Sequence, residues 1–177
     1  MNWTSYLFSF QGRINRAKLW LFILIVIGIY MVYFTLFWAV FGASLVAMMK
    51  GGSAGLAAGG ASFGAAMILT CLLFLVVLFA GIAVTVKRLH DRDKSAMWLL
   101  VFWLVPAMIE GVVLTNQVSL MHGNPDAMPM ATPGMIALRL VALAVSIWAF
   151  VELYCLRGTV GPNRYGPDPL AAPQSTP

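Results

Sequence analysis

The stretch "KRLHDRDKS", Lys87–Ser95, decides the fold, because it gathers six charged side chains and one histidine in nine residues. Neither the 36 residues before it (51–86) nor the 14 after it (96–109) carry any charge. A helix that crosses the hydrocarbon core of a bilayer needs about 20 mostly apolar residues. A short charged segment between two such runs therefore predicts two membrane-spanning helices joined by one polar loop.

The composition supports this interpretation. The chain has 177 residues, of which 61% are hydrophobic and only 10% charged. A soluble domain carries about 25% charged residues, and a soluble fold of this size could not bury so much apolar surface. The formal net charge of +5 is typical of a multi-pass membrane protein, because basic residues gather in its loops. We therefore expect no nucleic-acid partner.

Four apolar segments predict spans at about 19–41, 65–86, 96–115 and 135–156. The segment between the first and second spans, 50–64, is rich in Gly. The segment between the third and fourth spans, 116–134, is rich in Pro, Asn and Gly, and both compositions favour loops. The Gly spacing in 50–64 would alternatively let helices approach closely in lipid, and the sequence leaves this choice open. Cys71 and Cys155 lie in apolar runs and are expected to be free thiols.

The two ends of the chain differ from the spans. Before the first span, aromatic residues at helical spacing predict a short helix in the headgroup layer, with an irregular lead-in as the alternative. After the last span, "GPNRYGPDP" (161–169) has too many Gly and Pro residues for a helix and predicts turns. The predicted fold class is thus an all-α, integral membrane four-helix bundle: one four-span domain over residues 1–169, then a flexible tail, 170–177.

The basic residues are unevenly distributed. Nine of the 11 Lys and Arg residues lie before the first span, in the 87–95 loop or after the last span: Arg13, Arg16, Lys18, Lys87, Arg88, Arg92, Lys94, Arg157 and Arg164. Of the other two, Lys50 lies in the first outer loop and Arg139 within the fourth span. Because basic loops stay in the cytoplasm, both termini and the 87–95 loop are predicted to be cytoplasmic.

Three motifs carry a family resemblance: "FSFQGRINRAKLW" (8–20), "RLHDRDKSAMWLL" (88–100) and "GPNRYGPDP" (161–169). Their order and spacing resemble the YhaH-like family of small bacterial inner-membrane proteins, a domain of unknown function (number eight hundred and five). The matching residues are Gly12, Arg13, Arg16, Trp20, Arg88, His90, Asp91, Ser95, Trp98, Gly161, Asn163, Tyr165, Gly166, Asp168 and Pro169. The chain departs from the family pattern at Leu19, Ala96 and Met97, where aromatic, Gly and Trp residues are usual. The resemblance implies a bacterial inner-membrane location and no particular activity.

Because all three motifs fall on the predicted cytoplasmic side, we expect them to meet in one polar cluster. The forked guanidinium of arginine suits carboxylate and phosphate equally well. One interpretation is an internal arginine–aspartate lattice that ties the helix ends together. The other is a pocket for a phospholipid headgroup or another phosphate group, and the two are compatible.

The same residues give little support to metal binding or catalysis. His90 with Asp91 and Asp93 supplies too few ligands at too irregular a spacing for a zinc site. Ser95 is better explained as a helix N-cap than as a nucleophile. We therefore predict no cofactor and no enzymatic activity. The expected role is structural or regulatory, with membrane lipids as partners and a partner membrane protein or a second copy of the chain as further candidates.

Two other classes of function remain as alternatives. A small-solute transporter or channel would need polar residues at mid-membrane, and the second predicted span offers only Thr70, Cys71 and Thr85. An enzyme acting on a lipid phosphate would need the arginines to face an open cleft.

The last prediction concerns charges within the spans. Glu110 lies about 21 Å from the inner end of the third span and Arg139 about 26 Å from that of the fourth, at about 1.5 Å per residue. Ionisable side chains in lipid tend to pair, so an ion pair between Glu110 and Arg139 is predicted, with snorkelling of Arg139 as the alternative. Glu152, near the inner end, is expected to face the cytoplasmic arginines, with Arg88 and Arg13 as candidates.

Overall fold

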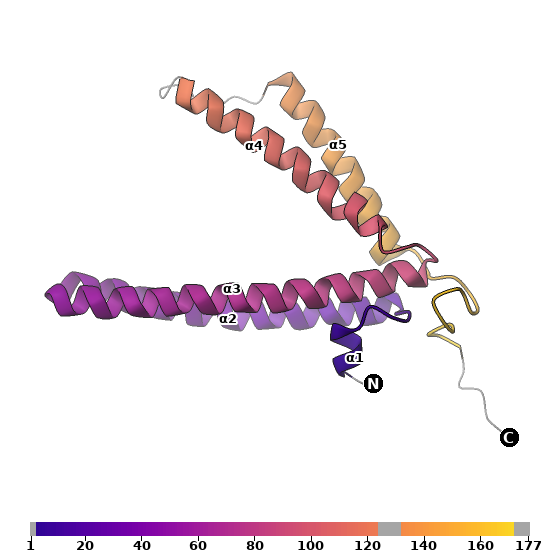
Figure 1. The fold of residues 1–177 in the computed structure, drawn as a ribbon, viewed down its shortest axis with the longest axis horizontal. Coiled ribbons are helices and arrows are strands. Elements are labelled where there is room, and N and C mark those ends of the chain that lie inside the picture. Colours follow the sequence, from indigo (N-terminus) through magenta and orange to yellow (C-terminus); the bar gives the residue numbers. More distant parts are fainter. Residues whose placement is uncertain (1–2, 124–131, 172–177) are drawn as a thin grey trace. The chain divides into compact units, whose positions relative to one another are not determined.

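The structure is a computed structural model that describes residues 3–123 and 132–171. Its elements are α1 (Trp3–Phe8), α2 (Arg16–Lys50), α3 (Gly52–Asp91), the π-helical turn η1 (Leu100–Leu104), α4 (Val105–Gly123), α5 (Pro133–Phe150) and the π-helical turn η2 (Val151–Cys155) (Figure 1). Four helical segments are long and apolar enough to cross a membrane: Arg16–Lys50, Gly52–Asp91, Leu100–His122 and Pro133–Cys155. The predicted all-α membrane protein with four spans is therefore confirmed.

The described chain divides into two compact units. The first unit contains residues 3–9 and 17–84, and the second contains 10–16, 85–123 and 132–171. Helix α3 continues from the first unit into the second. Most of the predicted flexible tail, 172–177, lies outside the described residues.

In the first unit, α2 and α3 form a helical hairpin, and the predicted loop at 50–64 is helical from Gly52 onward. Gly51, Gly55 and Gly59 explain this outcome. A Cβ atom at Gly51 or Gly55 would overlap the carbonyl oxygen of Ala47, and one at Gly59 would overlap atoms of Ser44 and Met48. Glycine here permits close helix packing, which outweighs its poor helix propensity.

Hydroxyl groups add hydrogen bonds along the same hairpin. The hydroxyls of Ser44 and Ser62 lie 2.7 Å apart, and the Tyr33 hydroxyl bonds to that of Thr70. The short helix α1, expected from the aromatic spacing, belongs to this unit, and the Tyr6 hydroxyl donates to the backbone carbonyl of Lys18 at 2.5 Å.

In the second unit, α4 and α5 lie side by side, and the third span continues to Gly123 instead of ending at Thr115. The predicted loop at 116–134 is thus helical up to residue 123, and residues 124–131 lie outside the described chain. Polar side chains do not end the helix, because Asn116, Ser119 and His122 each bond to the carbonyl four residues earlier. The π-turn η1 precedes Pro106, whose ring would clash with the carbonyl of residue 102 in a regular α-helix.

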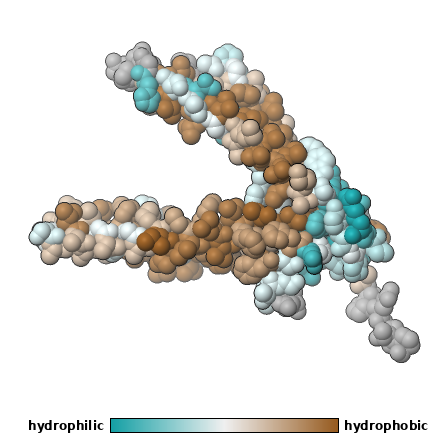
Figure 2. Space-filling view, in the orientation of Figure 1, coloured by the Kyte–Doolittle hydropathy of each residue, from teal (hydrophilic) through white to brown (hydrophobic). Residues whose placement is uncertain are grey.

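Apolar side chains cover most of the helical surface (Figure 2). In α2 only Leu19 and Ser44 are buried, as expected for a helix that lies against lipid. Hydrophilic side chains gather over the end of α3 and the segment that follows η2 (Figure 2). This polar region of the second unit holds the candidate site.

Candidate functional site: an arginine–aspartate cluster at the helix ends

Asp91, in the last turn of α3, lies at the centre of the cluster. Its Oδ1 is 3.1 Å from the guanidinium of Arg13, and its Oδ2 pairs with Nη1 of Arg88. The side chains of Arg13, Arg88 and Asp91 are 1%, 0% and 3% exposed. One carboxylate thus balances one of two buried positive charges, and such charges are stable only when their remaining donors are also satisfied.

Backbone carbonyl groups accept those remaining donors. Arg13 donates to the carbonyl oxygens of Thr159 at 2.6 Å, Gly161 at 2.7 Å and Gly166 at 3.3 Å. Arg88 donates to the carbonyls of Leu153, at 2.8 Å, and Leu156. Leu153 lies in the last turn of η2 and Leu156 is its C-cap, a position where carbonyls lack partners within the helix and carry partial negative charge. The excess charge of the cluster is therefore offset by carbonyl dipoles.

The segment after η2 is bound to the end of α3 by further contacts. The backbone N–H of Thr159 donates to the Asp91 carbonyl at 2.8 Å, and Nδ2 of Asn163 donates to the His90 carbonyl at 2.9 Å. The rings of His90 and Tyr165 stack with their centroids 3.8 Å apart.

Two glycines close the turns of this segment. Gly161 has φ +80° and Gly166 has φ +140°, both left-handed conformations that favour glycine. An isolated β-bridge joins Gly166 to Asn163, and the described residues contain no regular strand. The tail is turn-rich, as predicted.

The structure brings most of the motif residues together and places three of them elsewhere. Assembled around the end of α3 are Gly12, Arg13, Arg16, Arg88, His90, Asp91, Gly161, Asn163, Tyr165, Gly166, Asp168 and Pro169. Trp98 instead packs against Phe102 and Trp148. The Ser95 carbonyl accepts the Trp98 N–H at 3.2 Å in the turn before η1, and the N-cap of η1 is Leu99, so the N-cap expected at Ser95 is wrong. Trp20 belongs to the first unit.

Glu152 pairs with an arginine of the 87–95 loop, as expected, and with a lysine of the same loop. It lies 3.0 Å from Arg92 and 3.7 Å from Lys94, not against Arg88 or Arg13. The reason is that Arg88 and Arg13 already pair with Asp91. The acidic residue had been located correctly near the basic loop, but sequence spacing could not tell which base it would meet.

Sequence reasoning missed Thr159 and Gly158. Oγ1 of Thr159 accepts a hydrogen bond from Arg13 at 3.1 Å, and a Cβ atom at Gly158 would overlap the Asp91 carboxylate. The two residues lie just before the third motif, with Val160 in between, and that proximity was the only available signal. No sequence signal identifies the carbonyl groups that accept from Arg13 and Arg88, because every residue carries a carbonyl group.

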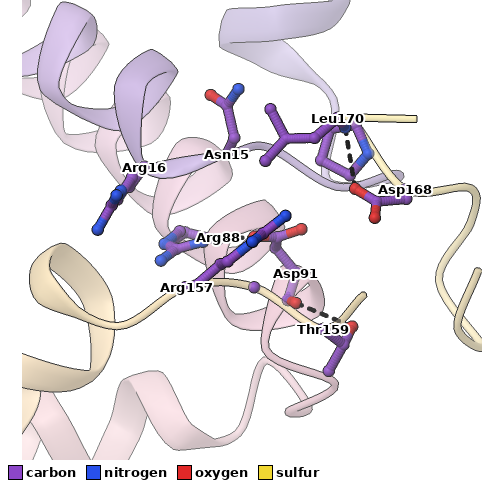
Figure 3. A pocket seen from close by; sticks show the side chains of 10 residues that line it. Asn15, Arg16, Arg88, Asp91, Arg157, Thr159, Asp168 and Leu170 are labelled. Atoms are coloured by element: carbon purple, nitrogen blue, oxygen red, sulfur yellow. Dashed lines mark hydrogen bonds and ion pairs between the residues drawn. The ribbon is translucent and has the colours of Figure 1, made fainter. Parts of the chain in front are cut away.

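A pocket of about 170 Å³ opens beside the cluster (Figure 3). Its lining includes three arginines, Arg16, Arg88 and Arg157, and two carboxylates, Asp91 and Asp168. Arg16 donates Nη1 to the Cys155 carbonyl at 3.2 Å. The Arg157 guanidinium makes no hydrogen bond or ion pair within residues 3–123 and 132–171. The pocket therefore presents uncommitted cationic donors.

Asp168 lies at the edge of the same pocket. Its Oδ1 accepts the backbone N–H of Leu170 at 2.9 Å, and its Oδ2 accepts that of Gly161 at 3.0 Å. These two hydrogen bonds, with the charges of Arg13 and Arg157 as weaker contributions, hold the pKa of Asp168 below its ordinary value. The carboxylate is consequently ionised at neutral pH.

A second group of polar residues lies on α4 and α5. Nε of Arg139 is 3.6 Å from Oε2 of Glu110, so the two side chains form an ion pair that is about half exposed, at 44% and 54%. A separate groove of about 510 Å³ is lined by Asn116, Ser119, Leu120, Thr132, Gly134, Met135 and Leu138. Neither charged residue lines this groove. Both cysteines are free and exposed, and the His, Cys, Asp and Glu residues of the described chain form no metal-binding group of three.

Comparison with known proteins gives one consistent result. The family model described as "Protein of unknown function (DUF805)" matches residues 7–167. The chain is 28% identical over 167 residues to "Uncharacterized protein YiiR" of Escherichia coli (strain K12), covering 93% of this chain and 88% of the relative. It is 29% identical over 166 residues to "Inner membrane protein YhaH" of the same organism, covering 93% and 90%. No solved structure matches. Since the family model covers nearly the whole chain, as the three motifs predicted, this membrane protein belongs to the DUF805 family, whose function is unknown.

Proposed function

We propose that this protein is a non-enzymatic, multi-pass protein of the bacterial inner membrane that binds the phosphate of a lipid headgroup beside its arginine–aspartate cluster. Its role is structural or regulatory. Four apolar helices and the relative named "Inner membrane protein YhaH" support the location. With the basic residues retained in the cytoplasm, both termini and the cluster lie on the cytoplasmic side.

The observation that carries the proposal is the state of the arginines around the pocket. Arg13 and Arg88 are committed to Asp91 and to carbonyl groups, so they serve the fold. The Arg157 guanidinium makes no hydrogen bond or ion pair in the described chain, and Arg16 uses one of its donors for the Cys155 carbonyl. Uncommitted guanidiniums around one pocket suit the bidentate recognition of phosphate.

The position of the pocket favours a lipid as the source of that phosphate. Arg16 begins α2, Arg88 and Asp91 lie in the last turn of α3, and Arg157 follows the end of η2 by two residues. Each of these segments therefore lies where a span ends. Lipid phosphates lie at the corresponding depth of the bilayer, just outside the hydrocarbon core.

The absence of enzymatic activity is part of the proposal, and the state of Asp91 supports it. Each of its oxygens already accepts from a guanidinium, so it has little capacity to act as a general base. Asp168, the other carboxylate of the pocket, holds two backbone N–H groups.

The test compares lipid retention by single variants. The protein is purified in mild detergent, and bound phospholipid is quantified by native mass spectrometry for wild type, Arg157→Gln and Arg164→Gln. Arg164 is the matched control, because it is an arginine of the same segment that pairs with Asp93 and does not line the pocket. We expect Arg157→Gln to lose most of the bound lipid and Arg164→Gln to retain it. Equal retention by all three proteins would contradict the proposal.

A further inference from the structure

We propose that the pocket selects a phosphate that carries a primary ammonium group, the chemistry of a phosphoethanolamine headgroup, with Arg157 and Arg16 facing the phosphate and Asp168 facing the ammonium. This inference rests on the proposed function, because it names the headgroup that the same pocket takes.

The charged side chains around the pocket are of two kinds: some pair with one another in the fold, and others are available to a ligand. The side chains of Asp91, Arg13 and Arg88 are nearly fully buried, and both arginines pair with Asp91. Arg157 and Asp168 have no ion-pair partner within the described ranges. The pocket thus has one uncommitted positive group and one uncommitted negative group, and both belong to the same short segment.

Asp168 presents a carboxylate of fixed orientation at the pocket. The two backbone N–H groups that bond to its oxygens fix the orientation of the carboxylate. A carboxylate offers about four lone-pair sites, so roughly half of its capacity remains for a ligand. An ammonium group with several N–H donors is the natural partner for these sites.

Arg157 and Asp168 are separated from each other across the pocket. Arg157 and Asp168 line one pocket but do not approach within the 4.0 Å of an ion pair. A ligand with a negative and a positive end can occupy this gap and satisfy both groups. A glycerol headgroup has no cation for Asp168, and a choline headgroup has no N–H to donate. Among the ethanolamine, glycerol and choline headgroups, ethanolamine therefore fits the charge pattern best.

The experiment uses a series of soluble probes on the wild-type protein in detergent, so that it does not depend on a variant folding. Isothermal titration calorimetry compares O-phosphoethanolamine, ethyl phosphate and phosphocholine. A hydrogen bond to a charged group supports an affinity gain of about tenfold. We expect O-phosphoethanolamine to bind about tenfold more tightly than the other two probes.

Two variants then assign the groups. Asp168→Asn should bind O-phosphoethanolamine and ethyl phosphate equally, whereas Arg157→Gln should lose affinity for every probe. Equal wild-type affinities for O-phosphoethanolamine and ethyl phosphate would overturn the inference and leave the proposed phosphate site standing. If no phosphate probe bound and no lipid were retained, both proposals would fall.

A last arm identifies the source of the ligand. The protein is reconstituted in nanodiscs of phosphatidylcholine that contain either phosphatidylethanolamine or phosphatidylglycerol, and co-isolated lipid is measured. Enrichment of phosphatidylethanolamine that Asp168→Asn abolishes would assign the site to the lipid. Preference for O-phosphoethanolamine in solution without such enrichment would support the inferred chemistry and assign it to a free compound, against the proposed lipid.

Discussion

At the scale of single residues, Asp91 has the most demanding position in the chain. Its carboxylate accepts hydrogen bonds from the guanidiniums of Arg13 and Arg88, while its own backbone carbonyl accepts the N–H of Thr159. An exposed ion pair contributes about 0–1 kcal/mol to stability, but removal of one partner from a buried pair costs about 3–5 kcal/mol. The second unit contains both types, since Arg164 and Asp93 form an exposed pair, 60% and 47% exposed.

This contrast gives a first prediction. Asp91→Ala should lower the free energy of unfolding by about 3–5 kcal/mol, because Arg13 and Arg88 would face each other without a counterion. Arg164→Ala, the control, should change it by less than about 1 kcal/mol. Thermal unfolding in detergent, followed by tryptophan fluorescence, measures both, and similar losses in the two variants would refute the assignment of the buried cluster.

The second prediction concerns the pH dependence of Asp168. Its pKa is lowered in the folded state, so its contribution to stability is present above the ordinary aspartate pKa of about 3.9 and is lost as the pH falls through the lower folded value. Leu170→Pro removes the N–H that contributes most and should raise the pKa toward the ordinary value. Leu170→Ala keeps that N–H and should leave the pKa unchanged. Carbon-13 NMR titration of the carboxyl group distinguishes these outcomes, and no difference between the variants would contradict the prediction.

At the scale of elements, the α2–α3 hairpin depends on a line of glycines that the sequence left between two interpretations. Gly55 lies against the carbonyl of Ala47, whereas a Cβ atom at Gly60, on the same helix, would meet nothing within 4 Å. Gly51 and Gly59 share the close approach of Gly55. The hairpin is therefore tight along one side of α3 and open along the other.

The third prediction compares these two sides. Gly55→Ala should destabilise the hairpin by about 1–3 kcal/mol, because the obstructing atom belongs to the backbone and the helices must separate. Gly60→Ala should stabilise it by about 0.5–1 kcal/mol through higher helix propensity. The midpoints of thermal unfolding should thus move in opposite directions, and a shift of the same sign in both would show that α2 and α3 are not so close.

The fourth prediction concerns the ion pair between α4 and α5. If Glu110 and Arg139 interact at the observed 3.6 Å, the two single alanine variants and the double variant should be non-additive. Coupled residues in contact show interaction energies of about 0.5–3 kcal/mol. A double-mutant cycle of unfolding free energies measures this coupling, and strict additivity would mean that each side chain finds its own polar surroundings.

How far the sequence predicted these elements depends on the signal that each one carries. Apolar runs located all four spans, and the distribution of basic residues indicated that Arg13, Arg88 and the 161–169 segment would meet. The helical start of α3 was not predictable, because glycine spacing suits both a loop and a packed helix. The carbonyl acceptors of the cluster and the two π-turns arise from tertiary geometry, which has no residue pattern of its own.

At the scale of the whole molecule, the first two spans are longer than a bilayer requires. The 35 residues of α2 and the 40 of α3 extend about 52 and 60 Å at about 1.5 Å per residue. The hydrocarbon core is about 30 Å thick, so both helices continue beyond it. We therefore expect the charged end of α3 and the glycine-rich turn at residue 51 to lie outside the hydrocarbon.

The fifth prediction is the orientation of these ends. A reporter that is active only in the cytoplasm should function when fused to the C-terminus, and one that is active only in the periplasm should function when inserted at Gly51. The reason is that nine of the 11 basic residues flank the proposed cytoplasmic ends of the spans. Periplasmic activity of the C-terminal fusion would reverse the proposed topology.

The bonds of Arg13 to the segment after η2 also set an order of events during synthesis. The residue and its acceptor Thr159 are 146 positions apart, so Arg13 leaves the ribosome long before its acceptor exists. At about 5–20 residues per second this delay is roughly 7–30 s. During that interval Arg13 lacks the carbonyl groups that later accept its hydrogen bonds. In a chain that stops before residue 159, Arg13 never acquires these acceptors. Completion of the last turn-rich segment is thus the step that distinguishes a finished molecule, with Arg13 enclosed by carbonyl groups, from a truncated one.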